Sequence, residues 1–132
     1  MGHTATIINK AGQRLDDLDF HMADSLAHGF YILMKAKECD GGVSGKGITK
    51  NYSLQDLIEI KNRILNLSYS ELIEIDHGMS YSELKTLLDK EGINEQDYLR
   101  VAINSQLGFI IGFVESAIKV AEIEDNVLIR YW

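Results

Sequence analysis

Leu107-Gly-Phe-Ile-Ile-Gly-Phe-Val114 is the longest uninterrupted apolar run of the chain. A membrane-spanning helix needs roughly 20 apolar residues, so this run is too short to cross a membrane. It lies within a segment that we expect to be helical from after Asn94 to about Ile123. The centre of this helix is apolar almost all round, which is typical of a helix buried in a protein core. The sequence therefore places this last helix at the centre of the fold.

Capping boxes mark the starts of four helices. In such a box a serine at the N-cap and an acid three residues later satisfy backbone N–H groups that the helix leaves free. Two strict boxes and two looser ones occur, at Ser68–Glu71, Ser80–Glu83, Ser53–Asp56 and Asn94–Asp97. Together with apolar spacings of three and four residues, they predict helices over about 54–66, 69–76 and 81–91, the last of which ends at Gly92.

Another long helix is predicted over about residues 13–38. Apolar side chains recur there at steps of three and four: Leu15, Leu18, Met22, Leu26, Phe30 and Leu33. The chain contains no proline that would break a helix. The predicted fold is mainly α, a bundle of four or five helices in which the last helix packs on the first.

Two terminal segments have the composition of strands. They are Thr4–Ile8 and Val127–Trp132, both short and rich in residues that favour strands. They could add a two-stranded β ribbon to the bundle, although such a ribbon is only marginally stable alone. A glycine-rich stretch at about residues 40–50 separates the first two predicted helices, and we expect it to be a flexible loop.

The length of 132 residues predicts a single domain over 1–132. The single cysteine, Cys39, has no intrachain partner for a disulfide, which favours a reducing compartment. The first residues lack the basic segment and apolar stretch of a signal peptide. We therefore expect a cytoplasmic protein.

The charge balance argues against nucleic acid as a partner. Thirteen Lys and Arg against twenty Asp and Glu give a formal net charge of −7. Binding to phosphates needs clustered Lys and Arg, and the densest basic patch here is only Lys35, Lys37, Lys46 and Lys50. An acidic surface keeps a protein soluble and would also suit a basic partner.

A candidate metal site lies on the predicted helix over 13–38. Asp17, His21, Asp24 and His28 follow one another at steps of four, three and four residues, so they would lie along one side of that helix. Neighbouring pairs could bind Zn, Mn, Fe or Ni. Because His21 and His28 would be about 10.5 Å apart along the axis, one ion would need ligands from elsewhere. Glu71, Glu74 and His77 are candidates, and a solvated polar face is the alternative interpretation.

A second candidate site is a groove along the last predicted helix, lined by Asn104, Gly108, Gly112 and Glu115. Each glycine in a helix interior costs about 1 kcal/mol relative to alanine, so two of them call for a reason. One reason is close approach of another backbone, for example across a dimer axis. The other is a small pocket in which Asn104 and Glu115 are the polar groups and the carboxylate acts as a base.

These patterns contain no complete catalytic set. The function they favour is a non-enzymatic regulatory or interaction protein of inhibitor, immunity or adaptor type. Its partner would be another protein or a second copy of the chain, with no cofactor, no nucleic acid and no membrane. The alternative is a metal-dependent, hydrolase-like enzyme that binds a divalent transition metal on the Asp/His face. The only tryptophan, Trp132, is expected to pack on Tyr131 or on a partner.

Overall fold

A computed structural model describes residues 2–21, 25–41, 44–67, 81–94, 97 and 107–132. In this part of the chain four strands form one antiparallel sheet in the order β2-β1-β4-β3. The strands are β1 (Gly2–Ile8), β2 (Arg14–His21), β3 (Ile48–Ser53) and β4 (Asn126–Tyr131).

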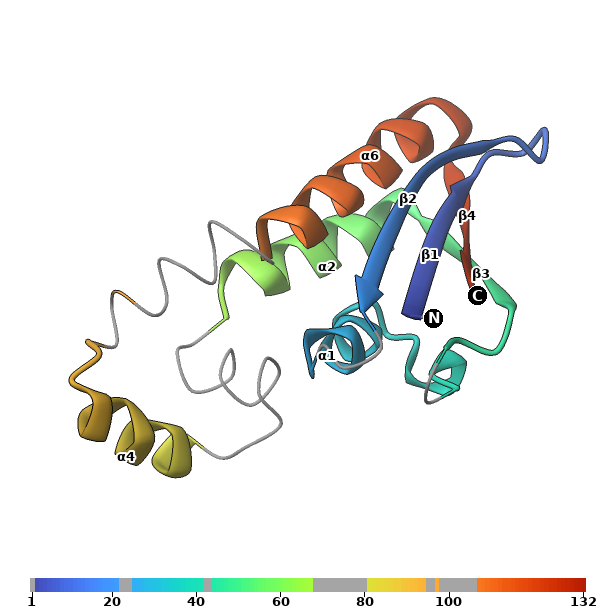
Figure 1. Cartoon of the computed structure of the whole chain (residues 1–132). Helices are drawn as coiled ribbons and strands as arrows, with labels where there is room; N and C mark the ends of the chain where they lie inside the picture. Colours follow the sequence, from blue (N-terminus) through green and yellow to red (C-terminus); the bar gives the residue numbers. More distant parts are fainter. Residues whose placement is uncertain (1, 22–24, 42–43, 68–80, 95–96, 98–106) are drawn as a thin grey trace.

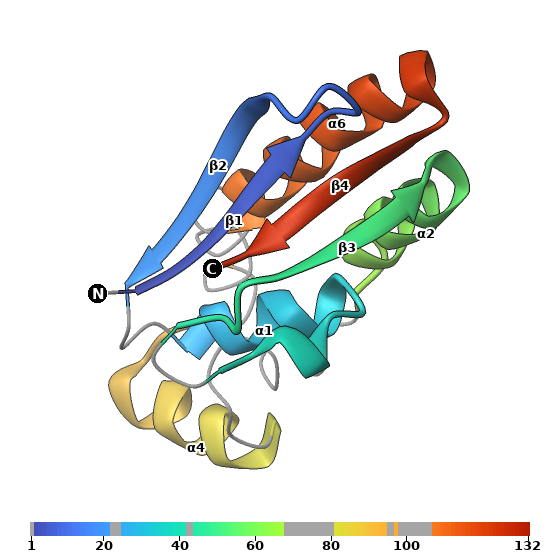
Figure 2. The same ribbon diagram turned by 90° about the vertical axis from the view of Figure 1, so that its right-hand side faces the viewer.

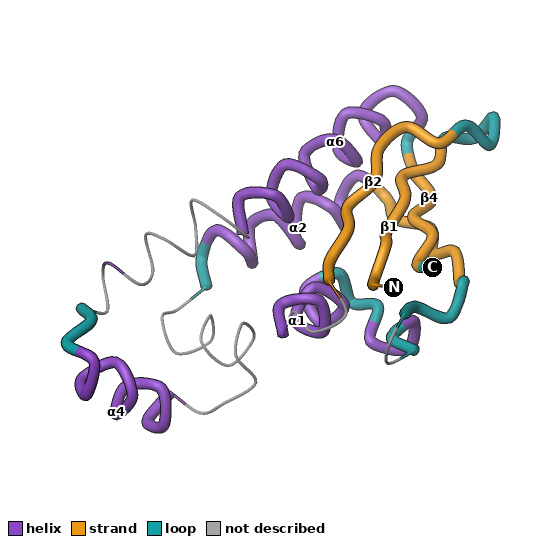
Figure 3. Tube along the Cα trace, in the orientation of Figure 1, coloured by secondary structure: helices purple, strands orange, loops and turns teal. Residues whose placement is uncertain are grey.

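Helices cover one face of the sheet. Helices α2 (Leu54–Leu65) and α6 (Gly108–Glu124) lie side by side on this face, and α1 (Ser25–Leu33) lies across one end of the sheet (Figure 1). A short 3-10 helix, η1 (Lys37–Cys39), follows α1, and α4 (Tyr81–Glu91) lies farther out. No described element lies in front of the opposite face (Figure 2), so strands and helices form two layers (Figure 3).

The prediction of a mainly α, four- or five-helix bundle is therefore wrong. The segment 13–38 is not one helix, because it contains strand β2 followed by α1 and η1. Leu18 and Phe20, each 9% exposed, alternate in β2 with the exposed Asp17 and Asp19. This alternation with a period of two is the pattern of a half-buried strand. The apolar spacing that predicts a helix combines Leu15 and Leu18 of β2 with Leu26, Phe30 and Leu33 of α1, which are two separate elements.

A tight turn over residues 9–13, just before the segment predicted to be one long helix, folds β2 back on β1. The Gly12 N–H donates to the Asn9 carbonyl at 3.0 Å, and the Asn9 N–H donates to the Gln13 carbonyl at 3.1 Å. Gly12 adopts φ 81°, the left-handed conformation that closes such hairpin loops and that other residues adopt only with strain. The turn sets the register in which Ala5 faces Leu18.

The two terminal segments do form strands. β1 and β4 pair in antiparallel fashion from Ala5 opposite Tyr131 to Ile8 opposite Leu128. They do not make an isolated ribbon, because they are the two central strands of the sheet, with β2 and β3 at its edges. β3 begins at Ile48, so it takes in the last part of the predicted loop at about 40–50.

Two of the predicted helices are confirmed. α2 begins with the predicted capping box, in which the Ser53 hydroxyl accepts from the Asp56 N–H and the Asp56 carboxylate accepts from the Ser53 N–H. These two hydrogen bonds hold the pKa of Asp56 below its usual value. α4 ends before Gly92, which has φ 71° as predicted for a glycine C-cap. The helix predicted over 69–76 lies outside the described residues.

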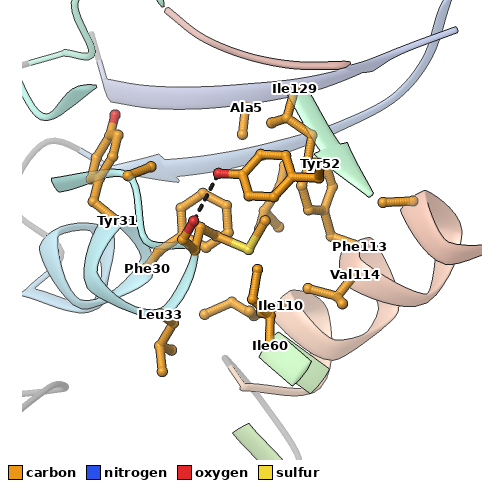
Figure 4. Close-up of a cluster of buried hydrophobic side chains, with 14 of the residues drawn as sticks. Ala5, Phe30, Tyr31, Leu33, Tyr52, Ile60, Ile110, Phe113, Val114 and Ile129 are labelled. Carbon is orange, nitrogen blue, oxygen red and sulfur yellow. Dashed lines mark hydrogen bonds between the residues drawn. The ribbon is translucent and has the colours of Figure 1, made fainter. Parts of the chain in front are cut away.

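The last helix ends at Glu124, close to the predicted end, and its buried side faces the core. Its N-terminal part, as predicted from after Asn94, falls largely outside the described residues. The aromatic ring of Phe30 in α1 packs against Phe113 of α6 and Tyr131 of β4, so α1 and α6 do meet in the core (Figure 4). None of the described helices is long and apolar enough to cross a membrane.

Candidate interaction surface on the open face of the sheet

The face of the sheet that points away from the helices has polar side chains across its centre, with Ile8 and Leu128 two residues further along β1 and β4. Residues directly opposite each other on paired strands point to the same side, so Thr6 of β1 shares this face with Asp17 of β2 and Arg130 of β4. Thr49 of β3 extends the same row, because it pairs with Arg130. The alternate residues point into the core. A row of four polar side chains thus crosses all four strands.

Trp132 lies across this row, held by hydrogen bonds to β1. Its indole Nε1 donates to the Thr6 hydroxyl at 2.7 Å, and its backbone N–H donates to the Thr4 carbonyl at 3.0 Å. The Thr6 hydroxyl donates in turn to Asp17 Oδ1 at 2.6 Å. Trp132 is still 39% exposed. The side chain is therefore both fixed in orientation and accessible to a partner.

Two guanidinium groups lie over the Trp132 ring. The central carbon of Arg130 is 4.2 Å from the ring centroid, and that of Arg14 is 5.3 Å from it. Such cation–π contacts hold arginines against an aromatic ring without using their N–H donors. Arg14 also lies 3.7 Å from the Asp17 carboxylate. Arg130 Nε is buried and has no hydrogen-bond partner among the described residues.

The glycine-rich stretch lies beside Trp132. A Cβ atom at Gly45 would collide with the Trp132 carbonyl oxygen and lie 3.0 Å from the carbonyl carbons of Tyr131 and Trp132. The neighbouring Lys46 N–H donates to the Cys39 carbonyl at 3.0 Å, which ties this segment to η1. A glycine is therefore required at position 45 so that the chain can pass close to the Trp132 backbone. We call Arg14, Arg130 and Trp132 the cationic cluster.

A second group of polar side chains is buried inside the core. His3 Nδ1 lies 3.0 Å from the Tyr31 hydroxyl, and the Tyr52 hydroxyl donates to the Met34 carbonyl at 2.8 Å. The hydroxyls of Tyr52 and Tyr131 share a hydrogen bond at 2.6 Å. Burial raises the pKa of all three tyrosines, that of Tyr31 to about 12, with Asp40 and Cys39 adding to the shift. These hydroxyls are closed off from solvent, so they hold the core together rather than react.

Stability should therefore fall at alkaline pH. The pKa of Tyr31 is raised from 10.0 in the unfolded chain to about 12 in the folded protein. Below the pKa that the hydroxyl has in the unfolded chain, its contribution to stability is fully present. This contribution is lost as the pH rises through the pKa that the hydroxyl has in the folded protein. Ionisation of tyrosine hydroxyls can be followed by absorbance as the pH is raised. Subtracting the curve of Tyr31→Phe from that of the wild type leaves the ionisation of Tyr31, which should have its midpoint near pH 12. A midpoint near 10 would show that the Tyr31 hydroxyl is accessible in the native state.

The structure separates the predicted metal ligands. Asp17 and His21 lie on β2, His28 lies on α1, and Asp24 is outside the described residues, as are Glu71, Glu74 and His77. The helical face that would have aligned these side chains is therefore absent. The Asp17 carboxylate is instead engaged by Thr6 and Arg14. Within the described ranges no three His, Cys, Asp or Glu side chains are grouped so that they could hold a metal ion.

The predicted groove along α6 differs from its expected form. Gly108 and Gly112 are exposed, and Asn104 lies outside the described residues. A Cβ atom at Gly112 would meet nothing within 4 Å, so no described backbone packs closely there. Glu115 forms an ion pair with Lys61 of α2 at 3.3 Å, within a shallow charged groove of about 310 Å³. This open groove has no buried polar group that would act as a base.

Replacing Gly112 with alanine should accordingly stabilise the protein. Alanine lowers the entropy of the unfolded chain and favours the helix, which together contribute about 0.5–1 kcal/mol. Urea unfolding of the two proteins measures this difference. Destabilisation in Gly112→Ala would mean that another backbone does approach α6 at this point, as the groove hypothesis supposes.

Sequence reasoning missed Arg14 and Arg130 as members of a site. The pattern Val127-Leu-Ile-Arg-Tyr131 alternates buried and half-buried residues in β4, so Arg130 must point away from the core-facing Ile129 and Tyr131. That alternation is visible in the sequence. The pairing that brings Arg14 to the same face is not, because it depends on the β1–β2 hairpin.

Comparison of the chain with protein-family models, with curated proteins and with solved structures found no match. What the open face can do chemically follows from its side chains. An ordered indole and two guanidinium groups can bind a partner by apolar contact, hydrogen bonds and charge. The cationic cluster contains no nucleophile and no acid–base pair.

Proposed function

We propose that the chain is a non-enzymatic interaction protein that binds a protein partner through the open face of its sheet. The observation that carries this proposal is the cationic cluster, in which Trp132 and two arginines are ordered on a face that no described helix covers. Tryptophan and arginine are the residues most enriched among those that dominate binding energies at protein interfaces. An inhibitor, immunity or adaptor role would use such a surface without any chemistry.

The order of the cluster supports binding. Trp132 is fixed by hydrogen bonds to Thr6 and to the Thr4 backbone, so little side-chain freedom is lost when a partner covers it. Ordering a mobile side chain at an interface costs about 0.5–1.5 kcal/mol, which a pre-ordered one avoids.

The two edge strands of the sheet, β2 and β3, differ in their exposed charges. This difference indicates the edge at which a partner would bind. The β2 edge carries the exposed aspartates at positions 16, 17 and 19, and its register shifts where it faces Ile7 and Ile8. Charges and bulges of this kind discourage a further strand from pairing. The β3 edge instead exposes Ile48, Thr49 and Asn51, which carry no charge, and the half-buried Lys50 between them is paired with Glu38 at 2.6 Å. Pairing of a partner's strand with the edge of the sheet is therefore less disfavoured at β3 than at β2.

Site-directed photo-crosslinking tests the proposal. A photoreactive amino acid at Thr49, on the open face, should capture a partner protein or a second copy of the chain in extracts of the source cells. The same group at Lys119, on the exposed side of α6, is the matched control and should not. Trp132→Ala, with its folding checked by circular dichroism, should abolish capture from position 49. Capture from Lys119 alone, or capture that survives Trp132→Ala, contradicts the proposal.

A further inference from the structure

The two sides of α6 differ in what packs against them. α2 lies along one side, where Glu115 of α6 forms an ion pair with Lys61 (Figure 1). No described helix lies along the other side. At about 100° per residue, four residues share this second side as one strip, which we call the free flank: Phe109, Ser116, Val120 and Ile123.

The free flank exposes large apolar side chains. Phe109 is 70% exposed and Ile123 is 85% exposed, the highest values among the large apolar residues of the described chain. Single exposed apolar residues are common on protein surfaces, whereas a contiguous strip of them marks an interaction surface. The free flank is therefore a second candidate surface, separate from the open face of the sheet.

A small apolar pocket lies at the C-terminal end of the free flank. Val120 and Ile123 line it together with Leu15 of β2. The Lys10 N–H donates to the Glu124 carboxylate at 3.1 Å, which holds the β1–β2 loop beside this end of the helix. The pocket volume is about 170 Å³. Sites for small molecules usually enclose about 300–1,000 Å³, so this pocket suits a single apolar side chain.

Phe109 has the right chemistry for this pocket but lies at the opposite end of the free flank. At 1.5 Å per residue, it is about 19 Å along the helix axis from the middle of the pocket, so it cannot fill the pocket of its own chain. The midpoint between the two lies close to Ser116. A two-fold axis at this midpoint places a second α6 antiparallel to the first and brings each Phe109 to the pocket of the other chain. The free flank is thus complementary to itself, as the interface of a two-fold dimer must be.

Ser116 permits close approach at this axis. Its side chain is small, and its hydroxyl donates to the Gly112 carbonyl at 3.1 Å. The one polar side chain of the free flank is therefore already hydrogen-bonded, and a second helix can cover it without leaving a donor unsatisfied.

We propose that two copies of the chain associate through their free flanks, with Phe109 of each copy in the pocket that Leu15, Val120 and Ile123 form in the other. Stable dimers usually bury about 800 Å² per partner, which one strip of four side chains with Leu15 does not reach. Association should therefore be weak, with a dissociation constant between about 10 µM and 1 mM. Lys119 points about 80–100° away from Phe109 and Val120 around the helix, so it stays outside the interface.

This inference does not depend on the proposed function, because the open face lies on the other side of the sheet from α6 (Figure 2). Both open faces remain accessible in such a dimer. A partner with two copies of the matching surface would then bind both at once and gain apparent affinity without any new contact.

Sedimentation equilibrium of the full chain from about 10 µM to 1 mM measures the association. Phe109→Ser should weaken it at least tenfold, because it removes an aromatic side chain that fills a pocket. Leu65→Ser is the matched control, since Leu65 is 58% exposed on α2, and it should have no effect. Each copy carries a net charge of −7, so association should strengthen as salt screens the repulsion.

A mixing experiment tests the fit of Phe109 to the pocket. Phe109→Ser keeps the pocket but lacks the ring, and Ile123→Asp keeps the ring but places a charge in the pocket. Neither variant can form the contact with itself. In a mixture, Phe109 of the Ile123→Asp chain can enter the pocket of the Phe109→Ser chain, so the mixture should associate several-fold more tightly than either variant alone. Both positions are exposed, so the two variants should fold.

Three results would overturn the inference: a wild type that is monomeric at 1 mM, a loss in Leu65→Ser equal to that in Phe109→Ser, or a mixture that associates no better than its components. Trp132→Ala should leave the association unchanged. If Trp132→Ala abolishes it while Phe109→Ser does not, the second copy binds at the open face. The proposed function would then stand, and pairing through the free flanks would be rejected.

Discussion

Replacing Phe30 with alanine should lower the free energy of unfolding by about 3–5 kcal/mol, the range found for large aromatic side chains removed from a core. Phe30 is only 1% exposed. Its ring packs on Phe20 of β2 at a centroid distance of 5.2 Å, on Phe113 of α6 at 6.0 Å and on Tyr131 of β4 at 6.2 Å. The substitution therefore leaves a cavity at the point where α1, α6 and the sheet meet.

Urea unfolding followed by circular dichroism measures this loss. The control is Ile32→Ala in the same helix, because Ile32 is 41% exposed. It should cost less than about 1 kcal/mol, as is usual for a surface position. Similar costs for the two variants would contradict the packing of α1 against the sheet and would reopen the question of how the N-terminal third of the chain folds.

Replacing Gly45 with alanine should displace Trp132 from the open face. The added methyl group would collide with the carbonyl oxygen of Trp132, which is backbone and has no rotamer by which to move aside. Overpacking of this kind costs about 1–3 kcal/mol. We expect the hydrogen bond from Trp132 Nε1 to Thr6 to break and the fluorescence of Trp132 to shift to longer wavelength. Capture of a partner from position 49 should be lost as well.

A second glycine provides the control for this variant. Gly12 has φ 81° and nothing within 4 Å of a Cβ position, so Gly12→Ala strains the hairpin turn without a collision. It should cost about 1 kcal/mol of stability while leaving the Trp132 emission unchanged. If Gly45→Ala also leaves that emission unchanged, the contact between the glycine-rich stretch and Trp132 is not what orders the cluster.

The elements that could be predicted from sequence are those whose stability is local. α2 and α4 were recognised because a capping serine and a C-cap glycine act within a few residues of the helix that they end. The sequence predicts a helix where β2 lies, because Leu15, Leu18 and Met22 fit helical spacing equally well. The alternation of Leu18 and Phe20 with aspartates argues for a strand, but over only a few residues. What decides between the two is pairing with β1, which is not a local property.

The candidate surface is even harder to predict from local sequence patterns, because it is built from segments that are far apart in the chain. Trp132 and Thr6 are hydrogen-bonded although they are 126 residues apart in sequence. Arg14 reaches the cluster only because the hairpin turn places β2 beside β1. The predicted metal ligands relied on a single helix, and that premise failed with the helix. A site assembled by strands from distant segments becomes visible only once the order of the strands is known.

The position of β4 has a consequence for how the chain folds during synthesis. β3 pairs only with β4 in the described sheet, and β4 joins it to the β1–β2 hairpin. Until the ribosome has released residues 126–131, the hairpin and β3 have no strand in common and the sheet cannot close. Pairings of such high contact order slow folding, because a long loop must be closed before they form. A chain that ended just before Asn126 would accordingly have the hairpin and β3 without the strand that joins them.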